Sequence, residues 1–503
     1  MTAIYEAYKP LRNLLRQCSL EGVLVDLWQL SLQMNSGTRT LNLSGQLPVP
    51  ETSLIAAWDL STIAREAILH AQPNGTKRLN SEAAVRRVIG VIRDIENEAS
   101  GLRLHSDNGE NNIVFIELLR ITHRQFPWQQ GNLKSSIVRN LKIFSAPEIA
   151  PMVERRTGLS VKAFFLLGLS LSGHLLSKCG INSDQDYSAF GISRAQAQAF
   201  FDRLSMDYRD LRRVIESHEG IDANWDYMWN PLEATPLISL DAAHPNRLHC
   251  PVPDLLLRRF SGGLYYDLVE ESGFGNAFGA AYEDYIGEVL AIAFSSIFYS
   301  VHKETPYLVG KDIHNGPDWI VCGPEGNLFI ECKTKRLTQA AKSASGEVTL
   351  LDDIGKIADA IVQHYKNVLE AIHGKSQWEP TPQPSWPVVI TFEDWYFLGS
   401  VLMQVLDEHV TSRLIAQSMD TKLTQSMPYF VMSTRELEMC VGAIADVGIS
   451  AFFKGKLDTK YRDWLWPEYL ASKFPTSKVI DFHRAFETDW RKIIPNAAMP
   501  GNA

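Results

Sequence analysis

Two acidic side chains and a lysine stand on neighbouring apolar stretches in the second half of the chain. Asp318 opens the run 318–322, and Glu331 and Lys333 stand near the end of the run 327–334. Ionised groups in a covered strand are costly unless they pair or bind a metal ion. Two converging carboxylates offer the hard oxygen ligands of Mg²⁺ or Mn²⁺, and a nearby ammonium can place water and meet charge developing on a phosphate. We therefore expect phosphodiester hydrolysis.

The two stretches are predicted to form a β-hairpin. They are separated by Gly-Pro-Glu-Gly-Asn at 323–327, a turn-forming sequence, and each is apolar at nearly every position. Alternation along a strand puts Glu331 and Lys333 on one face and Cys332 on the other. Asp318 joins them only if its cross-strand partner is Glu331 or Lys333, because a slip of one residue would turn it away. The alternative is a partly exposed strand on which Glu331 and Lys333 form surface ion pairs.

This pattern resembles the PD-(D/E)XK nuclease superfamily. Pro317-Asp318, a twelve-residue interval and Glu331-Cys332-Lys333 correspond to the motif of that superfamily. The predicted element order is also similar to its core: helix 278–298, strands near 305–310, 318–322 and 327–334, helix 352–371 and strand 387–392. The resemblance covers only the C-terminal half. It implies Asp318 and Glu331 as metal ligands, Lys333 as the catalytic lysine, Mg²⁺ (or Mn²⁺) as cofactor, and DNA as a commoner substrate than RNA.

The resemblance further implies a metal-assisting glutamate on the first core helix. Glu283 interrupts an apolar stripe of that helix, whereas Asp284 and Glu288 lie four residues apart on another side. Glu283 is therefore the candidate for a third metal-binding carboxylate. The alternative is a capping or rim carboxylate near the helix start, where the helix dipole favours acidic groups. The stripe consists of Gly279, Glu283, Ile286, Leu290 and Ile297.

Further residues near the motif are candidates for supporting roles. In some branches of the superfamily a Gln or Tyr on the second core helix supports the site, and Gln363 and Tyr365 are available here. Gln363 shares a stripe with charged residues, which indicates a solvated face. Lys335, Arg336 and Lys342 follow the motif and are expected to contact the nucleic-acid backbone, although charged loops are commonly just solvated.

The N-terminal half is predicted to be helical. Apolar residues recur there at three- and four-residue spacing, so we expect an all-α domain at 1–235. A Pro-rich stretch then marks a junction, and 236–503 is expected to form the nuclease-like domain with a helical C-terminal extension. The full expectation is an α/β fold: a restriction-endonuclease-like mixed sheet flanked by helices, preceded by an all-α lobe. The extension includes a strand-like run at 429–432 and a helix at 434–446 capped by Ser433 and Glu436.

Two local patterns suggest other chemistry. Gly158 and Gly191 each stand in a Gly-apolar-Ser step that leads into a helix, as in the turn before a recognition helix. Ser193 with Gln196 forms a capping box that any helix can use, so plain bundle helices are the favoured interpretation. Near the junction, 244–250 includes two histidines and a cysteine, His244, His249 and Cys250, that could be zinc ligands. No second ligand cluster is in sequence reach, which favours structural roles.

Composition limits the function classes. The chain has 503 residues, with 49 Lys and Arg against 58 Asp and Glu and a net charge of −9. Any binding to nucleic acid must therefore depend on a local basic patch. Six cysteines without a CxxC pair suit a reducing compartment. No apolar run reaches the ~20 residues that span a bilayer. With no secretory signal pattern at the N-terminus, we expect a cytoplasmic protein that does not bind membranes.

The sequence therefore predicts a cytoplasmic Mg²⁺-dependent endonuclease, for which bacterial restriction or anti-phage defence is a fitting role. The N-terminal domain is expected to recognise the substrate, a partner protein or a second copy of the chain. Two alternatives remain. One is a non-catalytic adaptor that uses a nuclease-like fold to bind nucleic acid or protein, and the other is a helix-turn-helix regulator that uses the turns at Gly158 and Gly191.

Overall fold

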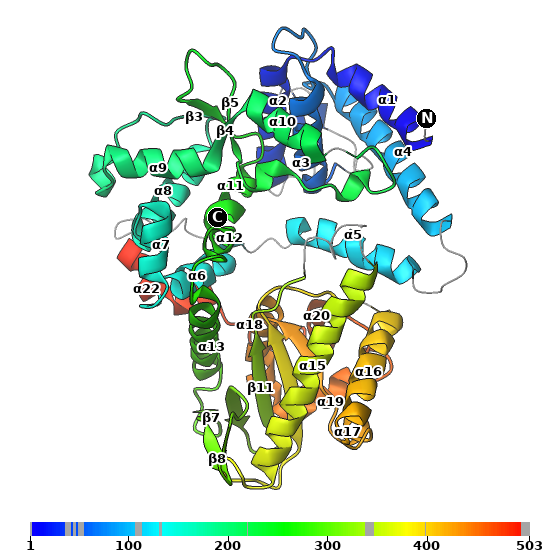
Figure 1. Ribbon diagram of the computed structural model, residues 1–503, viewed down its shortest axis with the longest axis vertical. Coiled ribbons are helices and arrows are strands. Elements are labelled where there is room, and N and C mark those ends of the chain that lie inside the picture. Colours follow the sequence, from blue (N-terminus) through cyan, green and yellow to red (C-terminus); the bar gives the residue numbers. More distant parts are fainter. Residues whose placement is uncertain are drawn as a thin grey trace. The chain divides into compact units, whose positions relative to one another are not determined.

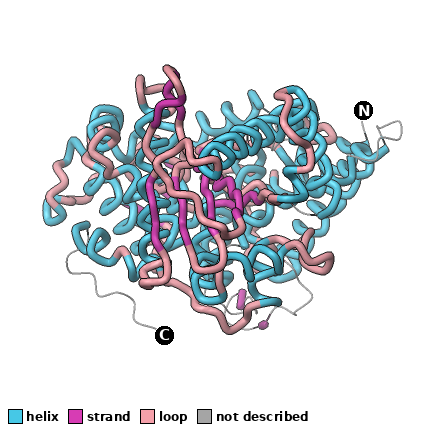
Figure 2. Tube along the Cα trace, turned by 90° about the horizontal axis from the view of Figure 1, so that it is seen from below, coloured by secondary structure: helices cyan, strands magenta, loops and turns pink. Residues whose placement is uncertain are grey.

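The chain folds into two compact units. The computed structural model describes residues 3–35, 42–43, 47–48, 55–105, 113–129, 133–218, 220–337, 347–397 and 399–493. The first unit comprises Met1–Glu117, Arg124–Phe274 and Asp489–Ala503. The second comprises Leu118–His123 and Gly275–Thr488. Helix predominates over strand (Figure 2), and no described helix has the length and apolarity needed to cross a membrane.

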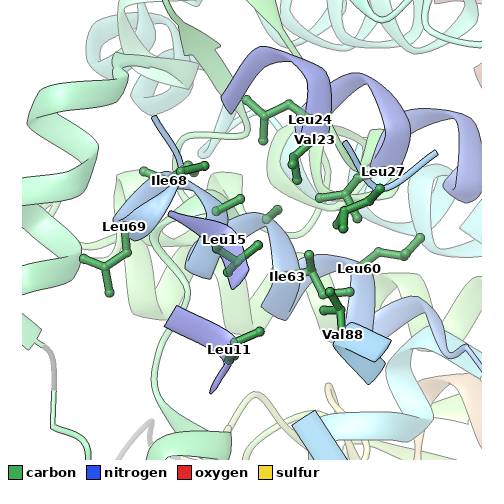
Figure 3. Close-up of a cluster of buried hydrophobic side chains, with 14 of the residues drawn as sticks. Leu11, Leu15, Val23, Leu24, Leu27, Leu60, Ile63, Ile68, Leu69 and Val88 are labelled. Atoms are coloured by element: carbon green, nitrogen blue, oxygen red, sulfur yellow. The ribbon is translucent and has the colours of Figure 1, made fainter. Parts of the chain in front are cut away.

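Helices make up most of the N-terminal part of the chain, as expected. They are α1 (Ala3–Leu15), α2 (Leu20–Asn35), α3 (Ala57–His70), α4 (Glu82–His105), α5 (Ile113–Gln129), α6 (Leu133–Phe144), α7 (Ala150–Thr157), α8 (Val161–His174), α9 (Arg194–Leu204), α10 (Tyr208–His218), α11 (Pro253–Phe260), α12 (Leu264–Leu268) and, near the C-terminus, α22 (Glu487–Ile493). Apolar side chains of α1 to α4 form one buried cluster, in which Leu15, Leu24 and Ile63 lie close together (Figure 3). This burial stabilises the helices against the entropic cost of ordering them.

The prediction of an all-α N-terminal lobe is wrong in one respect. The first unit also contains a four-stranded sheet in the order β3-β6-β5-β4. Its strands are β3 (Gly180–Asn182), β4 (Ser205–Asp207), β5 (Leu237–Ser239) and β6 (Arg247–His249). Three residues are too few to show the alternation that reveals a strand in a sequence. A further pair, β1 (Asn42–Leu43) with β2 (Leu47–Pro48), is shorter still.

The compact units divide later in the chain than the sequence suggested. The sequence placed a boundary after residue 235. In the structure, the chain passes from the first unit to the second between Phe274 and Gly275. The Pro-rich stretch is built into the first unit because β5 pairs in parallel with β4 and antiparallel with β6. The pairing of β4 with β5, which lie about thirty residues apart in the chain, cannot be predicted from the local composition of the Pro-rich stretch.

Both Gly-apolar-Ser steps form the helix-initiating turns that the pattern suggested. Gly158 and Gly191 have positive φ values of 76° and 71°, which glycine adopts without a steric penalty. Ser160 caps α8 by accepting a hydrogen bond from the amide of Ala163. At α9, the predicted capping box of Ser193 and Gln196 is confirmed. These local contacts explain both turns without any ligand.

The second unit contains a mixed sheet in the order β13-β12-β11-β10-β7. Its strands are β7 (Ser300–Lys303), β10 (Trp319–Cys322), β11 (Asn327–Lys333), β12 (Ser385–Thr391) and β13 (Phe430–Ser433). β10 pairs antiparallel with β7 and β11, whereas β11, β12 and β13 run parallel. The strand expected near 305–310 corresponds to β8 (Tyr307–Val309), which forms a small hairpin with β9 (Asp312–His314), whereas the strand that joins this sheet is β7, earlier in the chain.

Helices cover both faces of this sheet. They are α13 (Phe274–Ala293), α15 (Glu347–Ile372), α16 (Gly399–Ala416), α17 (Leu423–Ser426), α18 (Thr434–Val447), α19 (Ile449–Lys456), α20 (Trp466–Lys473) and α21 (Phe482–Ala485). Figure 1 shows α15 in front of the sheet with α16 beside it, and α18 and α19 behind the sheet. α13 packs with α18 through a hydrogen bond from Tyr285 to Glu438. The expected α/β class is thereby confirmed for this half of the chain.

One predicted helix begins where the sequence indicated, and another ends earlier than expected. The capping box of Ser433 and Glu436 at the start of α18 is confirmed. The first core helix ends at Ala293 rather than 298, so Ile297 is not part of its apolar stripe and is instead 94% exposed. A periodic pattern extends past a helix end by chance, because periodicity carries no information about where the helix stops.

A buried histidine makes the first unit sensitive to acid. Tyr8 donates a hydrogen bond of 2.6 Å to Glu66 and also contacts His70. Burial lowers the pKa of His70 to about 4, although Glu66 favours the protonated form. The unfolded imidazole, with its ordinary pKa near 6.5, therefore takes up a proton first. The contribution of neutral His70 to the free energy of unfolding is therefore fully present above pH 6.5. It decreases by about 2 kcal/mol as pH falls towards 4.

We expect His70→Gln to remove this part of the pH dependence. Urea denaturation of wild type and variant at pH 7 and pH 4.5 measures it. Between pH 7 and pH 4.5 the free energy of unfolding should decrease more in the wild type than in the variant. The difference should be close to the pH-dependent contribution of His70. Parallel loss in both proteins would contradict this role of His70.

Candidate active site

The register of the central hairpin brings the three motif side chains together. Trp319 lies opposite Ile330, so continuation by one residue places Asp318 opposite Glu331, which is the condition set by the sequence. Asp318 Oδ2 accepts a hydrogen bond of 2.6 Å from the amide of Cys332. Lys333 Nζ donates a hydrogen bond of 2.6 Å to Glu331 Oε1. The two carboxylates and the ammonium therefore gather where β10 begins and β11 ends.

This group is not a solvated surface pair. Only 7% of the Glu331 side chain is exposed, while 34% of the Lys333 side chain is. Every residue of β11 except Lys333 is buried. The alternative of two surface charges on a half-exposed strand therefore does not describe Glu331. The site thus combines a buried carboxylate with a partly exposed cation and a partly exposed second carboxylate, Asp318.

The pKa values show how strongly the acidic groups interact. Burial, together with the neighbouring charges of Glu331 and Glu283, raises the pKa of Asp318 to about 7. Burial also acts to raise the pKa of Glu331, but His364 and Lys333 outweigh it and the pKa lies below its ordinary value. Burial opposes the charge on Lys333, yet Glu331 and Asp318 raise its pKa overall. Crowded carboxylates of this kind favour a shared cation.

Glu283 lies on α13 within electrostatic range of this group. It is partly buried, and its pKa is raised first by burial and then by the charge of Glu331, against the opposing effect of Lys303. Asp284 and Glu288 are exposed, and Asp284 pairs with Lys303 at 2.5 Å. Among the three acidic candidates of this helix, Glu283 is thus the one whose charge interacts with Glu331.

A close helix–strand contact fixes α13 relative to β10. The indole Nε1 of Trp319 donates a hydrogen bond of 2.9 Å to the carbonyl of Glu283. One turn later, Gly287 faces the Trp319 ring so closely that an added Cβ would overlap it. Glycine is therefore required at this position for the helix to approach the strand. The contact anchors Glu283 next to the hairpin that carries Asp318.

The second core helix contributes a residue that sequence reasoning missed. Gln363 is exposed and bonds Asn367, and the buried hydroxyl of Tyr365 donates to the carbonyl of Met427 at 2.9 Å. Neither of these predicted supporting residues contacts the motif in the structure. His364 between them does: its Nδ1 lies 3.5 Å from Glu331 Oε2. The available signal was a histidine on the apolar stripe of Ile357, Ile361, His364 and Val368.

The predicted nucleic-acid contacts differ in accessibility. Lys335 Nζ lies 3.5 Å from Asp353 Oδ1 and 35% of its side chain is exposed. Arg336 donates to Glu393 at 2.8 Å, and only 10% of its side chain is exposed. Its guanidinium carbon lies 4.8 Å from the ring centroid of Phe392. In this arrangement Lys335 faces solvent and Arg336 does not, while Lys342 lies outside the described residues.

The residues of the hairpin fit a hard divalent cation. Within the described ranges, no set of three or more His, Cys, Asp or Glu side chains is arranged to hold a metal ion. Mg²⁺, however, is commonly held by only one or two carboxylates together with waters and substrate phosphates. Glu331 Oε2 is buried with no hydrogen-bond partner among the described residues. Two crowded carboxylates with an unsatisfied oxygen are suitable donors for such an ion.

The possible zinc ligands of the junction do not converge. His244 bonds Asp241 at 2.6 Å, and His249 lies 3.5 Å from Glu21. Cys250 is fully buried, and its neighbour Cys179 donates to the Cys250 carbonyl at 3.8 Å. The two histidines thus pair with different acidic residues and Cys250 is part of the buried core, which fits the structural roles that the sequence favoured.

No protein-family model, curated protein or solved structure matches this chain. Function is therefore inferred from the geometry of the hairpin and its surroundings.

Proposed function

We propose that the chain is a divalent-metal-dependent nuclease that hydrolyses phosphodiester bonds, with DNA preferred over RNA. The observation that carries this proposal is the gathering of Asp318, Glu331 and Lys333 at the end of one buried hairpin. Burying ionised groups between two strands lowers the stability of the fold, and this cost indicates that the groups have a functional role. A cytoplasmic role in restriction or anti-phage defence is the setting we associate with such an enzyme.

The arrangement of elements supports a restriction-endonuclease-like core similar to the PD-(D/E)XK superfamily. Helix α13 precedes the antiparallel strands β7, β10 and β11, and helix α15 then leads to β12, which is parallel to β11. Asp318 immediately precedes the second of these strands, and Glu331 and Lys333 lie at the end of the third. This is the placement that the resemblance implies for the metal ligands and the catalytic lysine.

Each residue has a definite role in the proposed chemistry. Asp318 and Glu331 would hold Mg²⁺ or Mn²⁺, with Glu283 assisting from α13. When bound, such an ion polarises the phosphate and lowers the pKa of a coordinated water. Lys333 presents its partly exposed ammonium to the attacking water and to the negative charge that develops on the phosphate. The positioning of these groups, rather than covalent catalysis, would accelerate the reaction.

A cleavage assay with the full chain tests the proposal. Purified protein is incubated with duplex DNA, single-stranded DNA and RNA in Mg²⁺, in Mn²⁺ or in excess chelator. We expect cutting with either metal ion and none with chelator, with DNA cut faster than RNA. Nucleic-acid binding without cleavage would favour the adaptor instead. The absence of both binding and cleavage would refute the proposal.

The accessible lysine beside the motif allows a prediction about binding. Lys335→Ala is expected to weaken DNA binding and to reduce the slope of log affinity against log salt by about 0.9, as for one lost phosphate contact. Binding is measured by fluorescence anisotropy at several salt concentrations, with chelator present to prevent cutting. Lys311→Ala, at the exposed end of the β8–β9 hairpin, is the matched control. An equal effect of both variants would show that Lys335 acts only through net charge.

A further inference from the structure

His364 joins α15 to the strand that carries the motif. It is 1% exposed, and its Nε2 lies 3.1 Å from the carbonyl oxygen of Phe329. Because a carbonyl oxygen only accepts, Nε2 is the donor in this contact. Nδ1, on the other side of the ring, lies 3.5 Å from Glu331 Oε2. The imidazole therefore spans two residues of β11 that point to the same face of the sheet.

The two atoms that face each other here are both unsatisfied. Among the described residues, His364 Nδ1 and Glu331 Oε2 are buried and have no hydrogen-bond partner. Their separation of 3.5 Å exceeds that of an ordinary hydrogen bond. The other oxygen, Oε1, is engaged by Lys333. Oε2 is therefore the oxygen of Glu331 that is left for a cation, and His364 is beside it.

We propose that His364 is a positioning residue that holds the Glu331 carboxylate so that Oε2 is presented to a divalent metal ion. This inference rests on the proposed function, since it concerns the same site. A free glutamate side chain samples several rotamers, and the polar contact with Nδ1 of a ring anchored to the same strand restricts them before the ion arrives. Groups that orient a metal ligand in this way typically change metal affinity about 10- to 100-fold.

Two substitutions separate positioning from packing. In His364→Asn the amide nitrogen falls near the place of Nδ1 and keeps a polar group next to Glu331. In His364→Gln the amide nitrogen falls near the place of Nε2, so the contact with Phe329 is kept and the one with Glu331 is lost. Positioning predicts that the Asn variant binds metal better than the Gln variant. Packing alone predicts the reverse order, because Gln fills more of the buried volume.

The experiment titrates Mn²⁺ alone into the full chain, without nucleic acid, and follows binding by calorimetry. The proteins are wild type, Glu331→Gln, both His364 variants and His373→Gln, a control at an exposed histidine just beyond α15. Thermal unfolding of each is recorded in parallel. We expect wild-type affinity for the control, a loss of about 10- to 100-fold for His364→Gln and a smaller loss for His364→Asn. Adding His364→Gln to Glu331→Gln should cause no further loss.

The outcomes separate this inference from the proposed function. If Glu331→Gln weakens Mn²⁺ binding but His364→Gln does not, the inference is overturned and the metal site remains. Mn²⁺ binding that does not depend on Glu331 overturns the metal site and this inference together. If His364→Gln does not fold, His364→Asn decides: a loss confined to the background with Glu331 intact supports positioning. A loss that persists with Glu331→Gln, or no loss at all, overturns it.

Discussion

Lys333→Met is expected to slow metal-dependent cleavage by about 10²- to 10³-fold, the usual effect of removing one group that stabilises charge in a transition state. Methionine keeps most of the apolar stem that packs at the end of β11 but carries no ammonium. The folded state should tolerate the change, because the lysine head is partly exposed while its partner Glu331 retains His364 nearby. Single-turnover cleavage at saturating Mg²⁺ measures the effect on the chemical step.

Asp318→Asn is the companion variant and should abolish cleavage without loss of stability. The Asn side-chain oxygen can still accept the hydrogen bond that Asp318 receives from the amide of Cys332. Since burial and neighbouring acids raise the pKa of Asp318 to about 7, its ionised form is disfavoured in the fold. A neutral side chain of the same shape removes that cost. We therefore expect an inactive protein whose urea midpoint at pH 8 equals or exceeds that of the wild type.

Lys366→Met is the matched control for both variants. Lys366 is exposed on α15, two residues from His364. Its loss changes the net charge by the same amount as Lys333→Met but touches no residue of the hairpin. Wild-type rates for Lys333→Met, or equal losses in Lys333→Met and Lys366→Met, would contradict the assignment of the catalytic lysine.

Arg103→Met is expected to lower the free energy of unfolding by about 3–5 kcal/mol, the largest stability effect we foresee. Arg103 lies on α4 and is 7% exposed. It pairs with Glu117 and with Asp226, whose Oδ1 lies 2.8 Å from the guanidinium. Its side chain also packs over the ring of Tyr227 at 4.7 Å from the centroid. Without the guanidinium, two buried carboxylates would lose their main cation at once, and among the described residues only the Tyr227 hydroxyl on Glu117 and Arg124 at 4.0 Å from Asp226 would remain.

The charge state of Asp226 explains why the loss is large. Burial raises the pKa of Asp226, and the hydrogen bonds and charge of Arg103 are the main factors that oppose this shift. Removing Arg103 therefore forces the folded protein either to bury an unpaired charge or to take up a proton. Both cost free energy at pH 7, and the second costs less as pH falls. The destabilisation should accordingly be smaller at pH 5 than at pH 7.

Arg86→Met on the same helix provides the control. Arg86 pairs with Glu82 one turn earlier, and 41% of its side chain is exposed. An exposed pair of this kind contributes about 0.3–0.5 kcal/mol, so its loss should be close to the limit of detection. Urea denaturation followed by far-ultraviolet circular dichroism measures both variants. If the two variants are equally stable, the buried cluster around Arg103 does not stabilise the first unit as inferred here.

Several elements of this protein follow from the sequence alone. The strands expected near 318–322 and 327–334, the capping boxes at Ser193 and Ser433, and the helical character of the N-terminal region are all found in the structure. Each depends on residues within a few positions of one another: apolar runs, turn formers, or a serine three residues before an acid or amide. Interactions between residues so close in the chain can be inferred directly from the amino-acid sequence.

Tertiary structure decided the remaining features. The register that sets Asp318 opposite Glu331 depends on how two strands pair, and the three-residue strands of the first unit depend on partners far along the chain. His364 could not be distinguished from an ordinary buried histidine until α15 packed against β11. Arg336 appeared to be a free cation until Glu393 and Phe392 were brought beside it. Sequence order does not show which distant groups meet, because packing and pairing across the whole chain select those contacts.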